Sequence, residues 1–571
     1  MTDATPTDQA RAAVRAYHDQ SKHRFERYAP GPASLDWEAQ PDPFRHFAGC
    51  PRLELPLPAG EIHLPFSALY TPGAVPPRPL DSVAVGALVE MSLAVSAWKA
   101  MGAARWAVRC NPSSGNLHPV EAYLVLPCTD LGPAGLYHYE AEDHALALRC
   151  HYDAALSGRL AGLLPPGCIL LGLSLVPWRE AWKYGVRAWR YCQLDLGHAI
   201  GALGYAAACI GWRMRALTDW SGPEIARLLG LNRAADFDRD EPEYPAALLM
   251  LGPDPLGLSP QPDLLAEIAE QGWQGKANRL DPRHLYRWEA VDAMARLDVP
   301  PVGPGPLAEA LPAFATAPSN PPAVQIIRRR RSARAFNPNA TIDAGTFYRL
   351  LDACRPRPGT GPWDLCQGQS RLHLLVFVHR VEELPPGLYL LAADPSAVAD
   401  LKAQMRPEFV WEPPPGCPAG LPCYRLISAD AQTAAMHLGC HQQICGQSAF
   451  ALAMLGEFDA AIGESPAGSC LPRGLPLPCG SSPAGYDLLY REAGRVGQAL
   501  YLHAEAEGLG SSGIGCYFDD AIHELIGLQD QRLQTVYMFT VGPARPELGV
   551  TDEPAYARVA TRAATALGRP L

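Results

Sequence analysis

The chain has 571 residues, 48% hydrophobic and 19% charged, which predicts at least two domains and excludes a disordered or fibrous protein. Its formal net charge of −11 opposes sequence-independent binding to nucleic acid or to an anionic membrane surface. The sequence shows no export signal and no run of about twenty apolar residues, so we expect a cytoplasmic protein with reduced cysteines and no membrane segment.

The first half of the chain predicts alternating helices and strands. Asp81 is placed to open a helix that contains Leu88 and Val89. An apolar strand near residue 122 then leads to Gly-Leu-Tyr at 135–137, and the strand AALLMLGP ends at Pro253.

The second half repeats this order of features. A helix opened by Asp343, a strand near residue 373, Gly-Leu-Tyr at 387–389 and the strand VYMFTVGP follow one another. Residues 191–231 and 488–528 also align without a gap at an offset of 297, with nine identical positions. We therefore expect a tandem duplication of one α+β unit, in which long helices pack on a mixed sheet.

A proline-rich segment separates the two halves. Prolines recur among Gly, Ala and Ser between Pro300 and Pro322, a composition that sustains neither a helix nor a ladder. We predict a first unit over residues 1–297, a linker over 298–325 and a second unit over 326–571, with an insertion near 456–484.

Two segments of the second half have residues suited to binding an anion. The run IIRRRRSARAF lies just before a predicted helix, and its guanidinium and hydroxyl groups can bind a phosphate, although a solvated basic run has the same composition. The segment GLGSSGIGC at 508–516 can present backbone N–H groups to a flat ligand, or can be an ordinary helix C-cap and turn. The candidate side chains in the basic run are Arg330, Arg331, Ser332 and Arg334.

One loop of the first half gathers small polar donors before a strand. Their arrangement suits a polar heterocycle, or equally a pair of Ser/Asn-capped turns. These residues are Pro112, Ser113, Ser114 and Asn116.

A second cluster has the residue types of a metal site. The surrounding sequence predicts a buried helix and no second C-x-x-C pair is present, so we expect no metal there. The cluster consists of His437, Cys440, His441 and Cys445. Cys417 with Cys423, or Cys470 with Cys479, are close enough in sequence to pair, but we expect thiols.

Together these motifs resemble the FMN-dependent nitroreductase superfamily in their running order: R-R-S-x-R-x-F, P-S-S-x-N, G-x-x-x-x-G-I-G and V-G-x-x-R. The first half is similar to the SagB/ThcOx-type dehydrogenases, which oxidise azolines to azoles. The residues that carry this likeness are R-x-x-P-S-S-G-x-L-H-P-x-E at 109–121, GLYHY at 135–139, and WKYGVRAWRY at 182–191 followed by Gly197-His198.

The resemblance implies that the two halves form an intramolecular pseudo-dimer with one FMN between them. The second half would supply Arg330, Arg331, Ser332, Arg334, Gly513, Ile514 and Arg545, and the first half Pro112, Ser113, Ser114 and Asn116. The reciprocal site would lack its cations and its loop, because Pro255 stands where the second half has Arg545 and TGPWDLCQGQSRLH replaces the Pro-Ser-Ser loop.

The resemblance also implies that Lys183 and Tyr184 are catalytic, with proton abstraction beside the flavin. Hydride loss from a saturated ring needs such a base, and burial can bring a lysine toward neutrality. Without the resemblance, a surface lysine and a core tyrosine would be the ordinary interpretation. We expect an FMN-dependent oxidoreductase acting on a heterocyclic or peptide-derived substrate, as a monomeric pseudo-dimer or a higher homo-oligomer.

Two alternatives remain open at this point. One is an NAD(P)H-dependent reductase of nitro or quinone compounds, although His118-Pro119-Val120 replaces the Q-P-W of many nitroreductases. The other is a catalytically silent flavin-binding subunit of a modification complex, because one half of a duplicated pair often decays.

Overall fold

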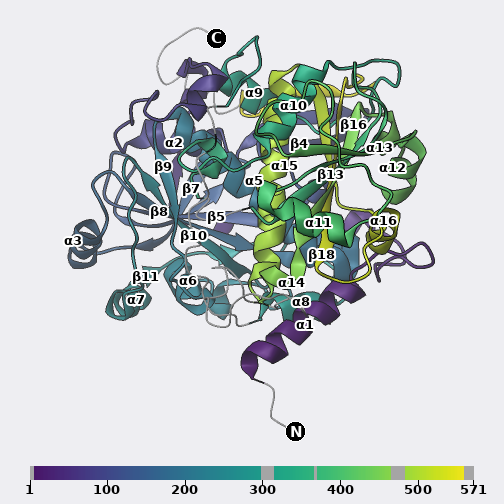
Figure 1. Ribbon diagram of the computed structural model, residues 1–571. Helices are drawn as coiled ribbons and strands as arrows, with labels where there is room; N and C mark the ends of the chain where they lie inside the picture. Colours follow the sequence, from purple (N-terminus) through teal and green to yellow (C-terminus); the bar gives the residue numbers. More distant parts are fainter. Residues whose placement is uncertain (1–4, 298–310, 312–313, 366–369, 464–482, 558–571) are drawn as a thin grey trace, which may run out of the picture.

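The computed structural model describes residues 5–297, 311, 314–365, 370–463 and 483–557 (Figure 1). Most of the expected linker and insertion, together with Cys470 and Cys479, lie outside these residues. Among the described residues, no helix is both long enough and apolar enough to cross a membrane.

The first half is built on an eight-stranded sheet with the order β11-β7-β6-β5-β8-β10-β9, to which β2 adds beside β7. β5 and β8 are buried at every residue, which fits their uninterrupted apolar sequences. The expected strand near residue 122 and the strand ending at Gly-Pro are therefore confirmed as β5 and β10. The strands are β2 (Arg52–Glu54), β5 (Val120–Leu126), β6 (Gly135–Glu140), β7 (Ala145–His151), β8 (Ile169–Leu175), β9 (Arg213–Ala216), β10 (Tyr244–Gly252) and β11 (Gly272–Trp273).

The second half has a six-stranded sheet with the order β15-β14-β13-β16-β18-β17. We expected mixed sheets, but the ladders between the named strands are antiparallel, and parallel pairing occurs at isolated bridges such as Ser332 with Ser511. Short connections explain this for the pairs β5–β6, β6–β7 and β13–β14, because a parallel pair needs a long crossover. The strands are β13 (Leu372–Val378), β14 (Gly387–Leu391), β15 (Cys423–Ser428), β16 (Phe450–Glu457), β17 (Gly510–Ile514) and β18 (Leu533–Gly542).

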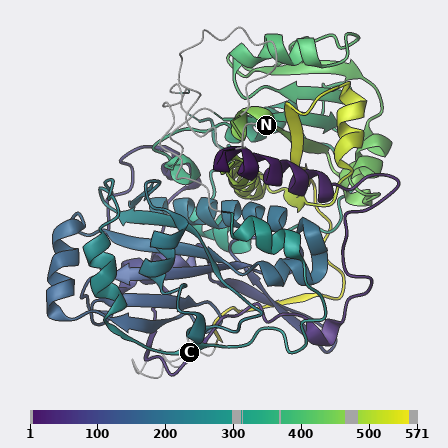
Figure 2. The ribbon, with the colours of Figure 1, turned by 90° about the horizontal axis from the view of Figure 1, so that it is seen from below.

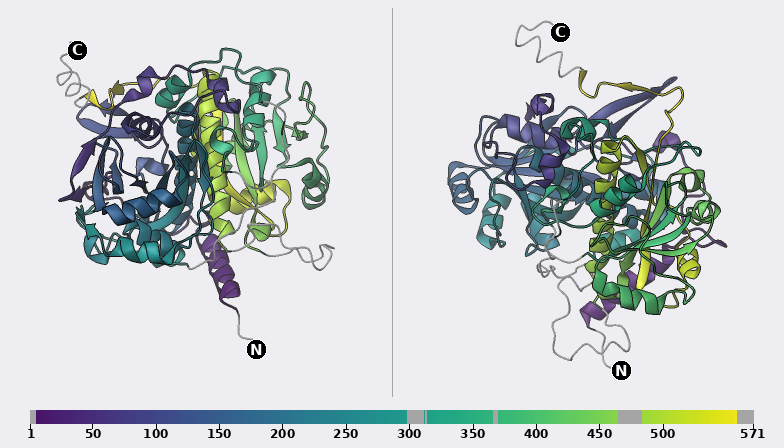
Figure 3. Two further views of the ribbon diagram at one scale, coloured as in Figure 1. Left: turned by 90° about the vertical axis from the view of Figure 1, so that its left-hand side faces the viewer. Right: turned by 45° about the horizontal axis from the view of Figure 1, so that its top comes forward.

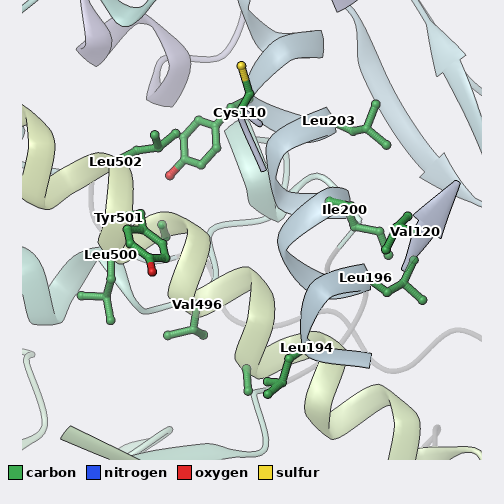
Figure 4. Packing of buried hydrophobic residues seen from close by; sticks show 14 of the residues in the cluster. Cys110, Val120, Leu194, Leu196, Ile200, Leu203, Val496, Leu500, Tyr501 and Leu502 are labelled. Atoms are coloured by element: carbon green, nitrogen blue, oxygen red, sulfur yellow. The ribbon is translucent and has the colours of Figure 1, made fainter. Parts of the chain in front are cut away.

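Two helices of 22 residues each, α5 (Ala188–Cys209) and α15 (Gly485–Ala506), lie side by side between the two sheets (Figures 1 and 3). Almost every residue of α5 is buried, and one hydrophobic cluster includes side chains of both halves. Figure 4 shows part of this packing, with Leu194 and Ile200 on α5 and Val496 and Leu500 on α15. The α+β pseudo-dimer is thus held together by a continuous core.

Both ends of the described chain cross to the opposite half (Figure 2). The N-terminal helix α1 (Pro6–Gln20) lies on the second half, where Arg15 pairs with Asp459 at 2.6 Å. The C-terminal strand β19 (Thr551–Glu553) pairs with β3 (Val95–Met101) of the first half, and the Tyr556 hydroxyl donates to the Ala141 carbonyl at 2.6 Å. Each half is therefore contacted by a terminal segment of the other. These segments are helix α1 of the first half and residues 545–557 of the second half, which we call the C-terminal arm.

The expected helix starts are present. Asp81 caps α2 (Ser82–Glu90) by accepting a hydrogen bond from the Ala84 N–H at 2.7 Å, and Asp343 caps α10 (Ala344–Ala353) through the Thr346 N–H at 2.8 Å. Other helices are α3 (Ala154–Leu163), α4 (Pro177–Tyr184), α6 (Gly222–Leu229), α7 (Pro262–Ala269), α8 (Glu289–Ala295), α11 (Val398–Gln404), α14 (Phe458–Ala461) and α16 (Asp519–Ile526).

Two local predictions need correction. The basic run does not lead straight into a helix: its first four residues form the end of α9 (Ala323–Arg329), which begins inside the predicted linker, and residues 330–334 come after that helix. The helix expected around His437 is broken into α12 (Gln432–Leu438) and α13 (Gln443–Gln447), because Cys440 and His441 adopt left-handed φ values of 52° and 60°.

Candidate functional site

The Pro-Ser-Ser loop of the first half is fastened to helix α5 by a single carboxylate. Asp195 accepts hydrogen bonds from the Ser113 hydroxyl at 2.5 Å, the Ser114 hydroxyl at 2.9 Å and the Ser114 N–H at 3.0 Å. Burial raises the pKa of Asp195 to about 7, although these three donors act against the shift. Both serine hydroxyls therefore point at the helix, whereas the sequence suggested that they could bind a ligand.

The rest of this loop is held from its own half. Asn116 donates from Nδ2 to the Ala107 carbonyl of β4 (Ala104–Arg109) at 2.8 Å, and its Oδ1 lies 3.0 Å from His118 Nε2. Gly115, at φ 60°, is the exposed tip. The serine and asparagine side chains of this loop are engaged in these contacts, and its tip is an exposed glycine. The loop would therefore present mainly backbone groups to a ligand.

Lys183 and Tyr184 reach this tip from the end of α4. A Cβ atom placed on Gly115 would lie 2.6 Å from the Tyr184 hydroxyl and 3.1 Å from Lys183 Nζ, so only glycine fits beneath them. Both side chains are half-buried, and the Tyr184 ring lies 4.4 Å from the ring of Tyr191 on α5. Burial lowers the pKa of Lys183, and Glu180 nearby would partly offset that effect only when it is ionised.

Glu180 is the most unusual group near this lysine. It is completely buried, and neither carboxyl oxygen has a hydrogen-bond partner among the described residues. Burial, with a smaller contribution from Asp195, raises the pKa of Glu180 well above its usual range. Sequence reasoning missed Glu180 and Asp195, although an acidic residue inside a helix of apolar periodicity was the available signal.

Arg330 of the second half reaches directly to the first half beside the Pro-Ser-Ser loop. Its guanidinium donates to the backbone carbonyls of Arg109 at 3.0 Å and Cys110 at 3.2 Å, just before Pro112. The group is buried and lies 5.0 Å from the ring centre of Tyr501. Its Nη1 has no hydrogen-bond partner among the described residues.

The other expected phosphate ligands are arranged around Ser332. The Ser332 hydroxyl lies 2.8 Å from that of Tyr501, another residue that sequence reasoning missed. Arg331 pairs with Asp552 at 3.2 Å and Arg334 with Glu547 at 2.9 Å, both carboxylates belonging to the C-terminal arm. Arg545 is exposed and makes no ion pair within the described part of the chain. Arg331 and Arg334 are therefore paired with carboxylates of the C-terminal arm instead of being directed at Arg330.

The glycine-rich segment is a strand edge, because Gly513 and Ile514 belong to β17. The Gly513 N–H donates to the Tyr501 hydroxyl at 2.9 Å, and Ile514 buries its side chain in the core of the second half. A Cβ atom would lie 1.9 Å from the Tyr537 hydroxyl at Gly513 and 2.0 Å from the Tyr191 ring at Gly515. These glycines allow the close approach of rings from both halves.

The metal-type cluster does not assemble around His437. Within the described ranges, groups with ligand atoms inside 4.8 Å of one another occur at His46, Glu140 and Asp143, where Arg52 pairs with both carboxylates. Cys417 and Cys423 are free thiols.

Comparison with solved structures identifies the fold of the chain. Over 93% of its length the chain is similar to a crystal structure from Anabaena variabilis ATCC 29413, of a protein assigned as a nitroreductase, with a TM-score of 0.65 and 20% identity over 99% of that chain. The chain has a nitroreductase fold. Residues 480–543 also match the model of the Nitroreductase family. A structure assigned as a nitroreductase from Exiguobacterium sibiricum 255-15, in complex with FMN, shares 18% identity and a TM-score of 0.22 over 42% of this chain and 94% of its own. No curated protein matches the chain.

In this nitroreductase fold the reciprocal position between the halves contains a cavity of about 400 Å³. It is lined by Thr71 and Gly211–Met214 of the first half and by Gly359, Gly361 and Asp364 of the second. Arg213 and Asp364 pair with each other at 3.2 Å, and Arg213 is the one cation among the described residues that line the cavity. The reciprocal position thus has space but few groups to bind a phosphate.

Proposed function

We propose that the chain is an FMN-dependent oxidoreductase of the SagB type, which holds one flavin between its halves and dehydrogenates a heterocyclic or peptide-derived substrate. The observation that carries this proposal is the contact of Arg330 with the carbonyls of Arg109 and Cys110. It joins the phosphate-type motif of one half to the Pro-Ser-Ser loop of the other.

The residues present fit FMN. A buried guanidinium nitrogen without a partner, at Arg330 Nη1, is a donor that a phosphate oxygen would satisfy. Ser332 would donate to the same phosphate, and Arg334 and Arg545 would complete its neutralisation once Arg334 releases Glu547. Gly513 and Gly515 are half-exposed and would lie along the ring system.

The chemistry divides between cofactor and protein. When bound, FMN would accept a hydride from the substrate. Lys183, whose pKa burial lowers, would take the proton that leaves the substrate ring. Tyr184, whose pKa burial raises well above its usual range, would stay a phenol and donate a hydrogen bond. Glu180 beside them would stay uncharged and leave the lysine free of a strong ion pair.

One experiment tests this function against its alternatives. The purified protein is mixed anaerobically with an azoline-containing peptide, with NADPH or with NADH, and bleaching of the flavin absorbance is followed. Bleaching by the azoline alone supports the dehydrogenase. Bleaching by a nicotinamide followed by turnover of nitro or quinone compounds supports a reductase, and a bound flavin that none of them bleaches supports a silent subunit.

A further inference from the structure

Two cysteines from distant parts of the second half meet beside the glycine-rich strand. Cys516 lies two residues after the end of β17, and Cys440 lies in the turn between α12 and α13. The two segments are fastened together, because the Phe518 N–H donates to the Leu438 carbonyl at 2.8 Å and Gln442 Nε2 donates to the Cys516 carbonyl at 3.1 Å. This places the two thiols close enough to shift each other's pKa values in opposite directions, Cys440 upward and Cys516 downward.

The backbone at Cys440 is held in an uncommon conformation. Its φ of 52° lies in the left-handed region, as does the φ of 60° at His441. Non-glycine residues occupy this region at an energetic cost, which the surrounding structure has to offset. The turn therefore holds the Cys440 thiol toward Cys516 in spite of that cost.

Basic groups from the first half surround the Cys516 thiol. His23 is hydrogen-bonded to it, and His23 Nδ1 accepts from the Ala29 N–H at 2.8 Å, which leaves Nε2 as the donor nitrogen of that ring. Arg187 donates to the Gly515 carbonyl at 3.1 and 3.2 Å, one residue away. The hydrogen bond from Cys440, with His23 and Arg187, lowers the pKa of Cys516 to about 5.

We propose that Cys440 and Cys516 form a redox-active dithiol that exchanges with small disulfides. The Cys516 thiolate attacks one sulfur of the disulfide, forms a mixed disulfide and releases one thiolate. Cys440 then attacks Cys516 Sγ, closes the Cys440–Cys516 disulfide and releases the second thiolate, which takes up the Cys440 proton. The small disulfide is reduced by two electrons, and the dithiol is oxidised by two.

Among the cysteines that the structure describes, Cys445, Cys128 and Cys417 lack this combination. Cys445 is fully buried, and burial raises its pKa to about 12. Cys128 is exposed and Cys417 lies beside Cys423, but neither has a histidine or arginine among the contacts described for it. Cys440 and Cys516 are both half-exposed, so a small disulfide can reach them. This proposal does not depend on the flavin chemistry above.

The test uses the full-length chain carrying Cys417→Ser and Cys423→Ser, so that the neighbouring pair cannot contribute. The protein is treated with hydroxyethyl disulfide at pH 6 and its peptides are mapped by mass spectrometry over time. At that pH an ordinary thiol is almost wholly protonated, so Cys516 should react about tenfold faster than Cys128 after allowance for its lower nucleophilicity. The expected product is the Cys440–Cys516 disulfide.

Two variants separate the steps. With Cys440→Ser, the hydroxyethyl adduct should accumulate on Cys516, because no second thiol resolves it. With His23→Gln, formation of the disulfide should slow severalfold while the circular dichroism spectrum is unchanged. The proposal is overturned if Cys128 is modified and Cys516 is not, or if both react and no Cys440–Cys516 linkage appears.

Discussion

Gly197 on α5 and Gly494 on α15 lie against each other where the two long helices cross. A Cβ atom on Gly494 would lie 2.9 Å from the Cα atom of Gly197 and 2.1 Å from the Leu194 carbonyl oxygen. The two glycines stand at equivalent positions of the two halves, 297 residues apart. The contact therefore joins two glycines that the gapless alignment of the two halves pairs with each other.

Replacing Gly197 by alanine should destabilise the protein. The new Cβ atom would lie 2.2 Å from the Arg491 carbonyl oxygen, a backbone atom that can move only with its helix. Overpacking of this kind costs about 1–3 kcal/mol, so we expect a lower thermal midpoint. Gly158→Ala in α3 is the matched control, because nothing lies within 4 Å of its Cβ position, and it should leave the midpoint unchanged or raise it. Equal midpoints for both variants would contradict the close crossing.

Features carried by local sequence could be predicted. Asp81 and Asp343 indicate the starts of their helices, because an N-cap side chain accepts a hydrogen bond from a backbone N–H within the next three residues. The apolar runs of β5 and β13 indicate buried strands. The order of the motifs along the chain could likewise be predicted from local patterns.

Contacts between distant segments could not be predicted in this way. Asp195 lies 81 residues from Ser114, and Asp552 lies 221 residues from Arg331, so no local pattern links them. Likewise, a left-handed turn at Cys440 depends on its tertiary contact with Cys516 and Phe518, which overrides the helical pattern of that segment.

Cleavage of the linker should not separate the halves. The core at α5 and α15 is continuous, and α1 and the C-terminal arm each contact the opposite half. An obligate interface of this kind survives the loss of one covalent connection. Limited proteolysis between Pro300 and Pro322 should therefore give two fragments that elute together in gel filtration without denaturant. Elution as two separate peaks would show that the halves are independent domains.

Removal of the exposed cations at the composite site should weaken flavin retention. Arg334→Gln with Arg545→Gln deletes two charges that would contact the phosphate, and charge-assisted hydrogen bonds are among the stronger ones available. We expect about one FMN per chain from the unmodified protein and clearly less from the double variant after dialysis, measured as released flavin. Arg213→Gln at the reciprocal cavity is the control and should release as much as the unmodified protein. Two equivalents of FMN, or FAD, would contradict a single composite site.

The Asp195 carboxyl should make stability depend on pH in a defined direction. Its pKa is about 7 in the folded protein, above its ordinary value of 3.8, so the folded state binds more protons between these values. Stability should therefore fall as pH rises from about 4 to about 7, by about 4 kcal/mol for this group alone. In Asp195→Asn this component is lost. Between pH 5 and pH 8 the thermal midpoint of the unmodified protein should therefore fall relative to that of the variant. A constant difference across that range would show that Asp195 does not titrate there.

Lys183→Ala should slow the chemical step and leave flavin binding intact. Lys183 lies at the tip of the Pro-Ser-Ser loop, away from the groups expected to hold the phosphate, and a general base typically contributes a factor of about 10² to 10⁴ in rate. Flavin reduction by substrate should slow by that factor, with an unchanged visible spectrum. In the unmodified protein the rate should rise with pH as Lys183 loses its proton, with a midpoint below the ordinary lysine pKa of 10.5, and this rise should vanish in the variant. Lys402→Ala is the matched control, because its ammonium group also lies over a tryptophan, 5.7 Å from the Trp411 ring compared with 5.9 Å between Lys183 and Trp37. Loss of flavin from Lys183→Ala, or normal turnover of this variant on an identified substrate, would show that Lys183 is not the general base. Either result would favour a simple flavin reductase.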